Sequence, residues 1–357
     1  MDGSTYDSLV MDEILEMSLT SVSISRPNPW VGAAVVVDGK VISLGGTKEL
    51  GDRHAEVVAL DSVVGRAQGS TMYVTLEPCA HFGRTPPCAE RIVRDGVKET
   101  VIGTLDPDAK VSGKGVAYLM NAGVKVKVLS QSRPVVYGLR QYVKHRTIGE
   151  PWVVLKLATT LDGKVAAKDG SSKWITSPES RYDAHLLRSN SDVIVVGANT
   201  VRVDDPSLTA RNSDGSEMRR QPKRIVLGTV PDGAKVVPAE SYVGEFSELL
   251  ERLGREEVLQ VLVEGGPKVA YDLHVKNLVD EYVFYIAPTL GLGGAKDAFD
   301  GLGGASIDDF WRSSFETVDR LGRDLRVSML SNRAKDLLDN HMNWSRRVAQ
   351  ELGAELV

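Results

Sequence analysis

Cysteine, excess positive charge and long apolar runs are all scarce in this chain. Only Cys79 and Cys88 occur among 357 residues, and such sparse use of cysteine fits a reducing cytoplasm. The chain has 43 Lys and Arg against 48 Asp and Glu, which gives a net charge of −5. This negative charge does not favour binding to nucleic acid or to an anionic membrane. The longest apolar runs, such as residues 31–37, are far shorter than the roughly 20 residues that span a bilayer. The first residues contain neither a cluster of positive charges nor an apolar stretch, so we expect no signal peptide.

Length and composition predict two ordinary globular domains. The chain is 42% hydrophobic and 25% charged, which allows substantial cores, and one domain usually takes about 100–200 residues. The polar stretch 133–150 ends in Gly149-Glu150-Pro151, where we expect the domain boundary. The expected division is a first domain over residues 1–148, a second over 149–330, and a C-terminal extension over 331–357.

The first half has the pattern of a hairpin followed by alternating strands and helices. Residues 9–19 carry apolar side chains at helical spacing, and the apolar runs 33–37 and 41–44 flank Asp38-Gly39, a hairpin signal. This order predicts a mixed sheet with helices on both faces. The other expected elements are helices from about residue 54, over 88–95 and over 115–121, and strands over 72–76, 100–103 and 124–129.

The second half also has an α/β pattern. Ser177-Pro178-Glu179 is typical of a helix start, with a serine cap, a proline at the first helical position and an acid in the first turn. Thr200 and residues 204–209 are expected on loops. The other expected elements are strands over 152–158, 192–197 and 259–263, and a helix over 245–253.

The phrase Glu264-Gly265-Gly266-Pro267 follows a strand and precedes a helix. Glycines there let a backbone approach an anion at a helix N-terminus, which is typical of a phosphate site, although a plain helix-starting turn is the alternative. The phrase is not a G-x-G-x-x-G fingerprint, so a Rossmann domain is not predicted.

Both cysteines lie in the stretch from Thr75 to Cys88, downstream of His54-Ala55-Glu56. Catalytic zinc takes three nitrogen or sulfur ligands and leaves the fourth position to water, whose pKa falls from 15.7 to about 7. We therefore expect His54, Cys79 and Cys88 to bind zinc. Glu56 is too close to His54 to be a comfortable ligand and can carry protons instead. His54 and Cys79 are expected where strand or loop passes into a helix, whose N-terminus favours thiolates.

Two alternatives compete with this catalytic site. Buried cysteines of intracellular proteins are usually inert, and a closed structural zinc site would need two histidines beside the two cysteines. His-x-Glu before a helix, then Pro-Cys after an apolar strand, is however the order found in zinc nucleobase deaminases. Cys88 follows Cys79 by nine residues instead of three, which places a longer loop over the metal.

Three phrases, residues 27–32, 54–57 and 75–88, together resemble the bifunctional deaminase–reductase family of bacterial riboflavin biosynthesis, and the resemblance covers roughly residues 5–330. It implies a three-layer cytidine-deaminase-like domain followed by an α/β domain similar to dihydrofolate reductase. It also implies zinc-dependent hydrolytic deamination of 2,5-diamino-6-(5-phosphoribosylamino)pyrimidin-4-one. NADPH-dependent reduction of the ribosyl group to ribityl would follow, with one Zn²⁺ in the first domain and NADPH in the second.

The resemblance implies that Asn28, His81 and Arg84 line the pyrimidine and ribose-phosphate site. From the residues alone, a turn-forming Asn28 and a solvated Arg84 are the alternatives. The family's usual Asp-Pro-Asn is Asp106-Pro107-Asp108 here, and a carboxylate cannot donate the hydrogen bonds of an amide.

In the second half the resemblance places Lys156 near the hydride-transfer centre, with Glu264 as its catalytic partner. The stretch 230–244 is shorter than the strand-helix-strand passage of typical members, so a silent domain used for binding or oligomerisation is the alternative. The implied substrate contacts are Ser172, Arg188, Leu208, Arg211 and Glu264, and the implied cofactor contacts are Ala158, Trp174, Thr200, Asp204, Thr229, Gly266, Pro267, Lys268, Val269, Ala270, Tyr271 and Asp272.

Residues 331–357 lie beyond the resemblance. Apolar side chains at positions 338 and 342, and at 344, 348 and 352, predict a helix packed on its own subunit or on a partner subunit, with no part in the chemistry. We expect a cytoplasmic homodimer or higher homo-oligomer that acts on a small molecule and binds neither membrane nor nucleic acid. A nucleic-acid deaminase is a further alternative, which the net negative charge disfavours.

Overall fold

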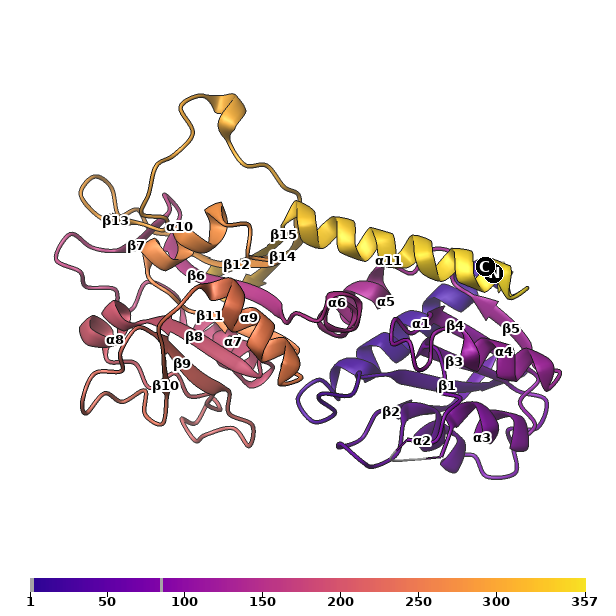
Figure 1. Cartoon of the computed structure of the whole chain (residues 1–357). Coiled ribbons are helices and arrows are strands. Elements are labelled where there is room, and N and C mark those ends of the chain that lie inside the picture. Colours follow the sequence, from indigo (N-terminus) through magenta and orange to yellow (C-terminus); the bar gives the residue numbers. More distant parts are fainter. Residues whose placement is uncertain (1–2, 84–85) are drawn as a thin grey trace. The chain divides into compact units, whose positions relative to one another are not determined.

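The computed structural model describes residues 3–83 and 86–357, which form two compact α/β units (Figure 1). The first unit contains the chain up to Gly149 together with Asp336–Val357, and the second contains Glu150–Lys335. Among the described helices, none is both long and apolar enough to cross a membrane.

The first unit contains a six-stranded mixed sheet in the order β16-β5-β4-β3-β1-β2. Strands β1 and β2 form the predicted hairpin, and β3 pairs with β1 in antiparallel fashion, whereas β3, β4, β5 and β16 run parallel. The strands are β1 (Gly32–Val37), β2 (Lys40–Gly46), β3 (Thr71–Leu76), β4 (Glu99–Thr104), β5 (Lys125–Val128) and β16 (Glu355–Leu356).

Helices cover both faces of this sheet, as the sequence predicts. Helix α1 (Gly3–Leu19) contacts β1, β2 and β3 and also α5 (Arg133–Gly138). Helix α2 (Ala55–Asp61) packs on the hairpin and contacts α3 (Cys88–Arg94), which in turn contacts α4 (Lys114–Asn121). The ends of α3 and α4 are followed by Gly96 and Gly123 with positive φ, consistent with the predicted glycine stops.

Two features of this unit were not predicted. The polar stretch after residue 132 folds into α5 and α6 (Arg140–Ile148), and the polar side chains of Gln141, Lys144 and His145 are buried there. The chain also returns to this unit at its end: α11 (Asn332–Glu351) is the expected C-terminal helix, and β16 adds a parallel edge strand beside β5 (Figure 1).

The second unit contains an eight-stranded sheet in the order β10-β9-β8-β11-β6-β12-β15-β14. The six strands from β10 to β12 are parallel, and β15 and β14 extend the sheet in antiparallel fashion. The strands are β6 (Trp152–Thr160), β8 (Val193–Gly197), β9 (Lys223–Leu227), β10 (Glu240–Tyr242), β11 (Gln260–Val263), β12 (Glu281–Ala287), β14 (Phe315–Leu321) and β15 (Asp324–Leu330).

The helices of this unit are α7 (Pro178–Ser189), α8 (Ala198–Asp204), α9 (Phe246–Arg255) and α10 (Pro267–Val275). Ser177 caps α7 as predicted, because its side chain accepts a hydrogen bond from the Ser180 amide. The loop prediction for Thr200 and Asp204 was wrong, since both lie on α8. A small sheet of β7 (Lys164–Ala166) and β13 (Lys296–Asp297) and a 3₁₀ turn (Ile307–Asp309) complete the unit.

Two candidate active sites

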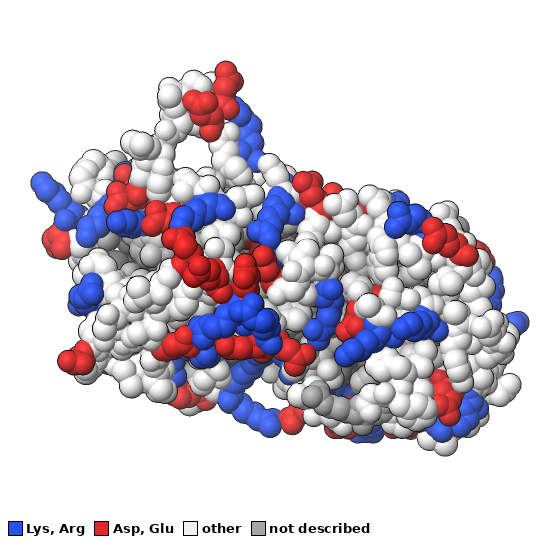
Figure 2. All heavy atoms as spheres, in the orientation of Figure 1, with Lys and Arg blue, Asp and Glu red and all other residues white. Residues whose placement is uncertain are grey.

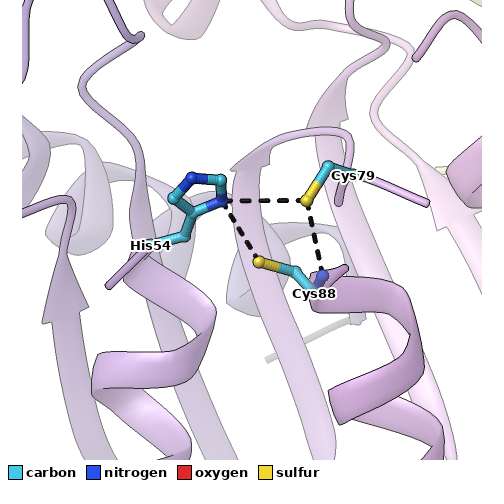
Figure 3. Close-up of side chains that lie close together, drawn as sticks. All are labelled: His54, Cys79 and Cys88. Atoms are coloured by element: carbon cyan, nitrogen blue, oxygen red, sulfur yellow. Dashed lines mark hydrogen bonds between the residues drawn. The ribbon is translucent and has the colours of Figure 1, made fainter. Parts of the chain in front are cut away.

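Three side chains converge in the first unit at the N-terminal ends of two helices (Figure 3). His54 is the residue that caps α2, Cys79 follows β3, and Cys88 is the first residue of α3. One ligand atom from each lies within 4.8 Å of the other two. The sequence therefore identified three residues that the fold brings together from segments 25 and 34 positions apart.

The spacing of these atoms suits zinc. Nδ1 of His54 lies 3.7 Å from Sγ of Cys79 and 3.3 Å from Sγ of Cys88. With Zn–S near 2.3 Å and Zn–N near 2.1 Å, tetrahedral geometry separates nitrogen from sulfur by about 3.6 Å. Three ligands of this kind leave a fourth position for water, as a catalytic site requires.

The surroundings of Cys79 favour its thiolate. The Cys88 backbone N–H, at the start of α3, donates to Sγ of Cys79 at 3.4 Å (Figure 3). Hydrogen bonds with the Cys88 side chain and with His54 lower the pKa of Cys79 far below its usual value. The prediction that Cys79 itself passes into a helix was wrong, because that helix begins only at Cys88, yet its N-terminus still faces the Cys79 sulfur.

Glu56 lies in the first turn of α2 and is 3% exposed. Burial raises the pKa of its carboxyl group, while the neighbouring His54 opposes that change. A carboxyl group whose pKa is moved toward neutrality can accept a proton and release it again, as the proton carrier predicted from the sequence must do.

A second buried glutamate supports this site and was not predicted as functional. The carboxylate of Glu77 accepts hydrogen bonds from the backbone amides of Asp106, Gly113, Gly115 and Val116, at 2.8–3.2 Å. Three of these amides belong to the N-terminus of α4, where a negative charge is stabilised. Because Glu77 lies two residues before Cys79, this carboxylate fixes the segment that presents the cysteine. An acidic residue directly after an apolar strand was the only signal in the sequence.

The Asp-Pro-Asp segment, residues 106–108, is fixed by hydrogen bonds and an ion pair within the first unit. The carboxylate of Asp106 accepts from the Asp108 amide and from the Tyr142 hydroxyl, and burial, together with the charge of Glu77, raises the pKa of Asp106 to about 7. The carboxylate of Asp108 accepts from the Lys110 amide and lies 3.5 Å from Nε of Arg146, so it organises the turn locally.

Of the remaining residues predicted for this site, Asn28 is half-buried and His81 is exposed on the loop between the cysteines. Their contacts with substrate stay predictions. Arg84 lies outside the described residues.

The second unit contains a cavity of about 660 Å³ at the carboxyl ends of its parallel strands. Ligands of open parallel sheets bind at this edge. Twelve of the residues predicted for this site line the cavity: Lys156, Ala158, Ser172, Trp174, Arg188, Thr200, Asp204, Leu208, Arg211, Glu264, Gly266 and Pro267.

A cluster of largely buried charges forms one wall of this cavity. Arg188 donates to both oxygens of Glu264, at 2.6 and 2.9 Å, and Nζ of Lys156 lies 3.7 Å from the same carboxylate. Arg188 and Lys156 lower the pKa of Glu264 to about 2 despite its burial. Burial lowers the pKa of Lys156, which Glu264 only partly offsets. Glu264 is therefore ionised at neutral pH, and Lys156 is the group in this cluster that can give up a proton.

Six predicted cofactor contacts do not line the cavity: Thr229, Lys268, Val269, Ala270, Tyr271 and Asp272. Ala270 lies in the hydrophobic core, and its amide is already bonded to the Gly266 carbonyl within the first turn of α10. The Tyr271 hydroxyl donates to the Leu302 carbonyl. Only the N-terminal residues of α10 face the cavity, because a helix turns its later residues away from a ligand at its end.

Several residues that line the cavity were not predicted, among them His185 and Tyr285. Nδ1 of His185 lies 3.1 Å from the Thr209 carbonyl, and Tyr285 donates to Asp183 at 2.6 Å while Nζ of Lys156 lies 5.6 Å from the centre of its ring. His185 lies one helical turn before Arg188, a spacing that could have indicated it.

Comparison with known proteins accounts for both sites. Residues 4–104 match the cytidine and deoxycytidylate deaminase zinc-binding region, and residues 151–326 match the RibD C-terminal domain. The riboflavin biosynthesis protein RibD of Aquifex aeolicus is 38% identical, over 90% of this chain and 97% of its own length. The chain belongs to the RibD family. RibD of Mycobacterium tuberculosis is also 38% identical, over 89% of this chain and 95% of its own.

Solved structures agree with this assignment. RibD of Acinetobacter baumannii superimposes with a TM-score of 0.84 at 32% identity, covering 92% of this chain and 99% of its own. A deaminase/reductase from Thermotoga maritima gives 0.81 at 31% identity, with the same coverage. As a RibD protein, this chain is a bifunctional enzyme of riboflavin biosynthesis, with a zinc-dependent deaminase and an NADPH-dependent reductase. A silent second domain finds no support. On the face shown in Figure 2, basic and acidic side chains are interspersed.

Proposed function

We propose that the first unit is the deaminase domain and the second unit the reductase domain, with the chain end from Asp336 belonging to the former. The proposed substrate is 2,5-diamino-6-(5-phosphoribosylamino)pyrimidin-4-one, and the deaminated product is then reduced at its ribosyl group. The Thermotoga maritima relative is a diaminohydroxyphosphoribosylaminopyrimidine deaminase and 5-amino-6-(5-phosphoribosylamino)uracil reductase, which supports a substrate of this class. The observation that carries the proposal is the convergence of His54, Cys79 and Cys88 beside the buried Glu56.

In the deaminase site, His54, Cys79 and Cys88 would hold zinc, which when bound makes water acidic enough to act as a nucleophile at neutral pH. Glu56 takes the proton of the attacking water as oxygen bonds to the ring carbon bearing the exocyclic amine. The same carboxyl group then passes the proton to the nitrogen as the carbon–nitrogen bond breaks and ammonia leaves. Its raised pKa suits it to both steps, because proton transfer is most effective when the carrier titrates near the working pH.

In the reductase site, residues of the cavity such as Thr200, Gly266 and Pro267 would hold NADPH, which when bound would supply the hydride for the carbonyl carbon of the ring-opened ribosyl group. The carbonyl oxygen needs a proton at the same time. Glu264 has none to give, because Arg188 and Lys156 keep it ionised. Lys156, with its lowered pKa, supplies the proton, and Glu264 holds Lys156 and the sugar hydroxyls in place.

A crossed experiment tests the two assignments. The Glu56→Gln enzyme should release no ammonia from the diamino substrate and oxidise no NADPH with it, yet oxidise NADPH normally when given the deaminated product. The Glu264→Gln enzyme should release ammonia from the diamino substrate normally but oxidise no NADPH, even when given the deaminated product. If the unaltered enzyme with saturating deaminated product oxidises no NADPH, the reductase assignment fails, and if Glu56→Gln still releases ammonia at the normal rate, Glu56 is not the proton carrier.

We also propose a homodimer formed through β14. This strand ends the sheet of the second unit, and its Phe315 and Val318 are 67% and 54% exposed. Paired with a second copy in antiparallel fashion about Val318, the strand would place Glu316 opposite Arg320 and Phe315 opposite Leu321. Unpaired edges favour such additions. Val318→Lys would place like charges face to face and should convert a dimer into a monomer in sedimentation velocity, whereas a wild-type monomer would contradict the proposal.

A cytoplasmic location is the last part of the proposal. The two cysteines must stay reduced to bind metal, and reducing compartments keep thiols in that state.

A further inference from the structure

The C-terminal helix makes two buried polar contacts with the end of β4. Nε2 of His341 lies 3.1 Å from the hydroxyl of Thr104, and the Leu105 amide donates to the hydroxyl of Ser345 at 2.9 Å. All four residues are buried. About 240 positions separate the partners in sequence. These bonds fix the segment Thr104–Asp106, which we call the β4 end.

The β4 end holds the segment that carries the first cysteine. The Glu77 amide donates to the Thr104 carbonyl at 3.0 Å, and the Asp106 amide donates to the Glu77 carboxylate at 3.2 Å. Glu77 is therefore tied to the β4 end by both its backbone and its side chain. Cys79 follows two residues later, so a shift of the β4 end would move a metal ligand.

The tail reaches the same glutamate by a second route. Gly113, whose amide also donates to Glu77, packs under the last turn of α11: a methyl group added to it would lie 3.0 Å from Leu352 and 3.4 Å from Val348. Gly115, the third amide donor, leaves no room against the Pro78 carbonyl, which a methyl group would approach to 2.0 Å. The C-terminal segment therefore packs on the N-terminus of α4, which packs in turn on Pro78, the residue beside Cys79.

The polar residues on the buried stripe of α11 are unusual for a helix that only covers a core. The stripe runs through Leu338, His341, Ser345 and Ala349 at helical spacing, with its two polar members in the middle. Burial lowers the pKa of His341 to about 4, so the imidazole is neutral at working pH and forms its bond to Thr104 uncharged. An apolar residue at either position would leave the Leu105 amide or the Thr104 hydroxyl without this partner.

We propose that the C-terminal segment is part of the deaminase site, with His341 and Ser345 as positioning residues that act through the β4 end and Glu77 on Cys79. This inference rests on the proposed zinc ligation by His54, Cys79 and Cys88. It replaces the expectation that the tail has no part in the chemistry.

The test compares Ser345→Ala and His341→Ala with the unaltered full-length enzyme. The zinc dissociation constant is measured by competition with a chelator, ammonia release gives kcat and KM of deamination, and NADPH oxidation with deaminated product serves as an internal control. We expect zinc to bind about tenfold more weakly and kcat to fall by a similar factor, the low end of the effects of changes around metal ligands. Ser345→Thr and His341→Gln keep a hydrogen-bonding group and should recover most of both. Asn340→Ala, on the exposed face of the same helix, should change neither.

Two results would overturn the inference. One is normal zinc affinity and normal kcat in folded Ser345→Ala and His341→Ala proteins, even if their melting temperatures fall, because a merely structural contact would lower stability alone. The other is an equal loss of deaminase and reductase activity. The proposed ligation fails separately, if the unaltered enzyme binds no zinc or if the variant with both cysteines replaced binds it fully.

Discussion

Each of the two sites contains a glutamate with a proposed part in the chemistry, Glu56 in the first and Glu264 in the second, and the neighbours give these two residues opposite properties. Glu56 is buried beside a histidine and two sulfurs, and burial raises its pKa. Glu264 is largely buried as well, with 11% of its side chain exposed, but Arg188 binds both of its oxygens and Lys156 lies 3.7 Å away, so its pKa falls to about 2. The first carboxyl group is suited to moving protons and the second to holding a charge.

This difference shows that a glutamate in an active site cannot be assigned a role from its burial alone. At the first site, the charge of His54 offsets only part of the effect of burial on the pKa of Glu56. At the second, two cations and one anion leave Lys156 as the group with the proton to give. The predictions below test this contrast, in order of expected effect.

The largest effect should follow loss of the metal ligands. In the variant Cys79→Ser with Cys88→Ser, zinc should be absent by elemental analysis and deamination should fall to the uncatalysed background, since no other group lowers the pKa of water. NADPH oxidation with deaminated product should stay within about twofold of wild type, because no charge at the second site depends on zinc. Full zinc occupancy in this variant would contradict the ligand assignment.

Glu56→Gln should lower kcat of deamination by about 10² to 10⁴ while zinc content stays complete, because the amide keeps the shape of the side chain and removes only proton transfer. The measurement is ammonia release at saturating substrate. Glu90→Gln, an exposed acid on α3, is the matched control and should behave as wild type. A Glu56→Gln enzyme that loses zinc instead would show that this residue organises the ligands.

The sequence could predict those features of the two sites and of the fold that depend on residues close together in the chain. His54, Glu56, Cys79 and Cys88 lie in two short motifs, and their expected chemistry follows from the residue types and their order. The hairpin, the parallel strands and the caps of the helices follow from short-range patterns as well.

What the sequence could not predict depends on distant partners. The partners of Glu77 are backbone amides 29 to 39 positions later in the chain. Because almost every residue has a backbone amide, residue types do not indicate which amides will bind a side chain. The buried polar residues of α6, such as Lys144, hide the apolar periodicity that identifies a helix, and α8 has only seven residues. The C-terminal helix was predicted, but its contact with Thr104 was not. Apolar periodicity predicts that a segment is helical and does not indicate which residues the helix will contact.

Glu264→Gln should have the next largest effect, at the second site only. Removing one partner of a buried charge cluster leaves Arg188 and Lys156 unpaired and typically costs about 3–5 kcal/mol. We expect at least a hundredfold loss of NADPH oxidation and a lower unfolding temperature for the second unit, with deamination unchanged. Glu251→Gln, an exposed acid on α9, is the control. Loss of deamination in Glu264→Gln would show that the two sites are not independent.

The smallest effect is the pH dependence of the same cluster. Because the folded pKa of Glu264, about 2, lies below its ordinary value of 4.5, its ionised form stabilises the fold fully above about pH 4.5. This contribution, up to about 3 kcal/mol, is lost as the pH falls toward 2. Hydrogen exchange of peptides from α7 and β11 should therefore show a stability difference between wild type and Glu264→Gln that shrinks from pH 5 to pH 2.5. In Glu251→Gln the exchange should follow wild type at every pH. A wild-type advantage that is independent of pH across this range would mean that the contacts of Glu264 stabilise the unit through packing, and that Arg188 and Lys156 do not hold it as an anion.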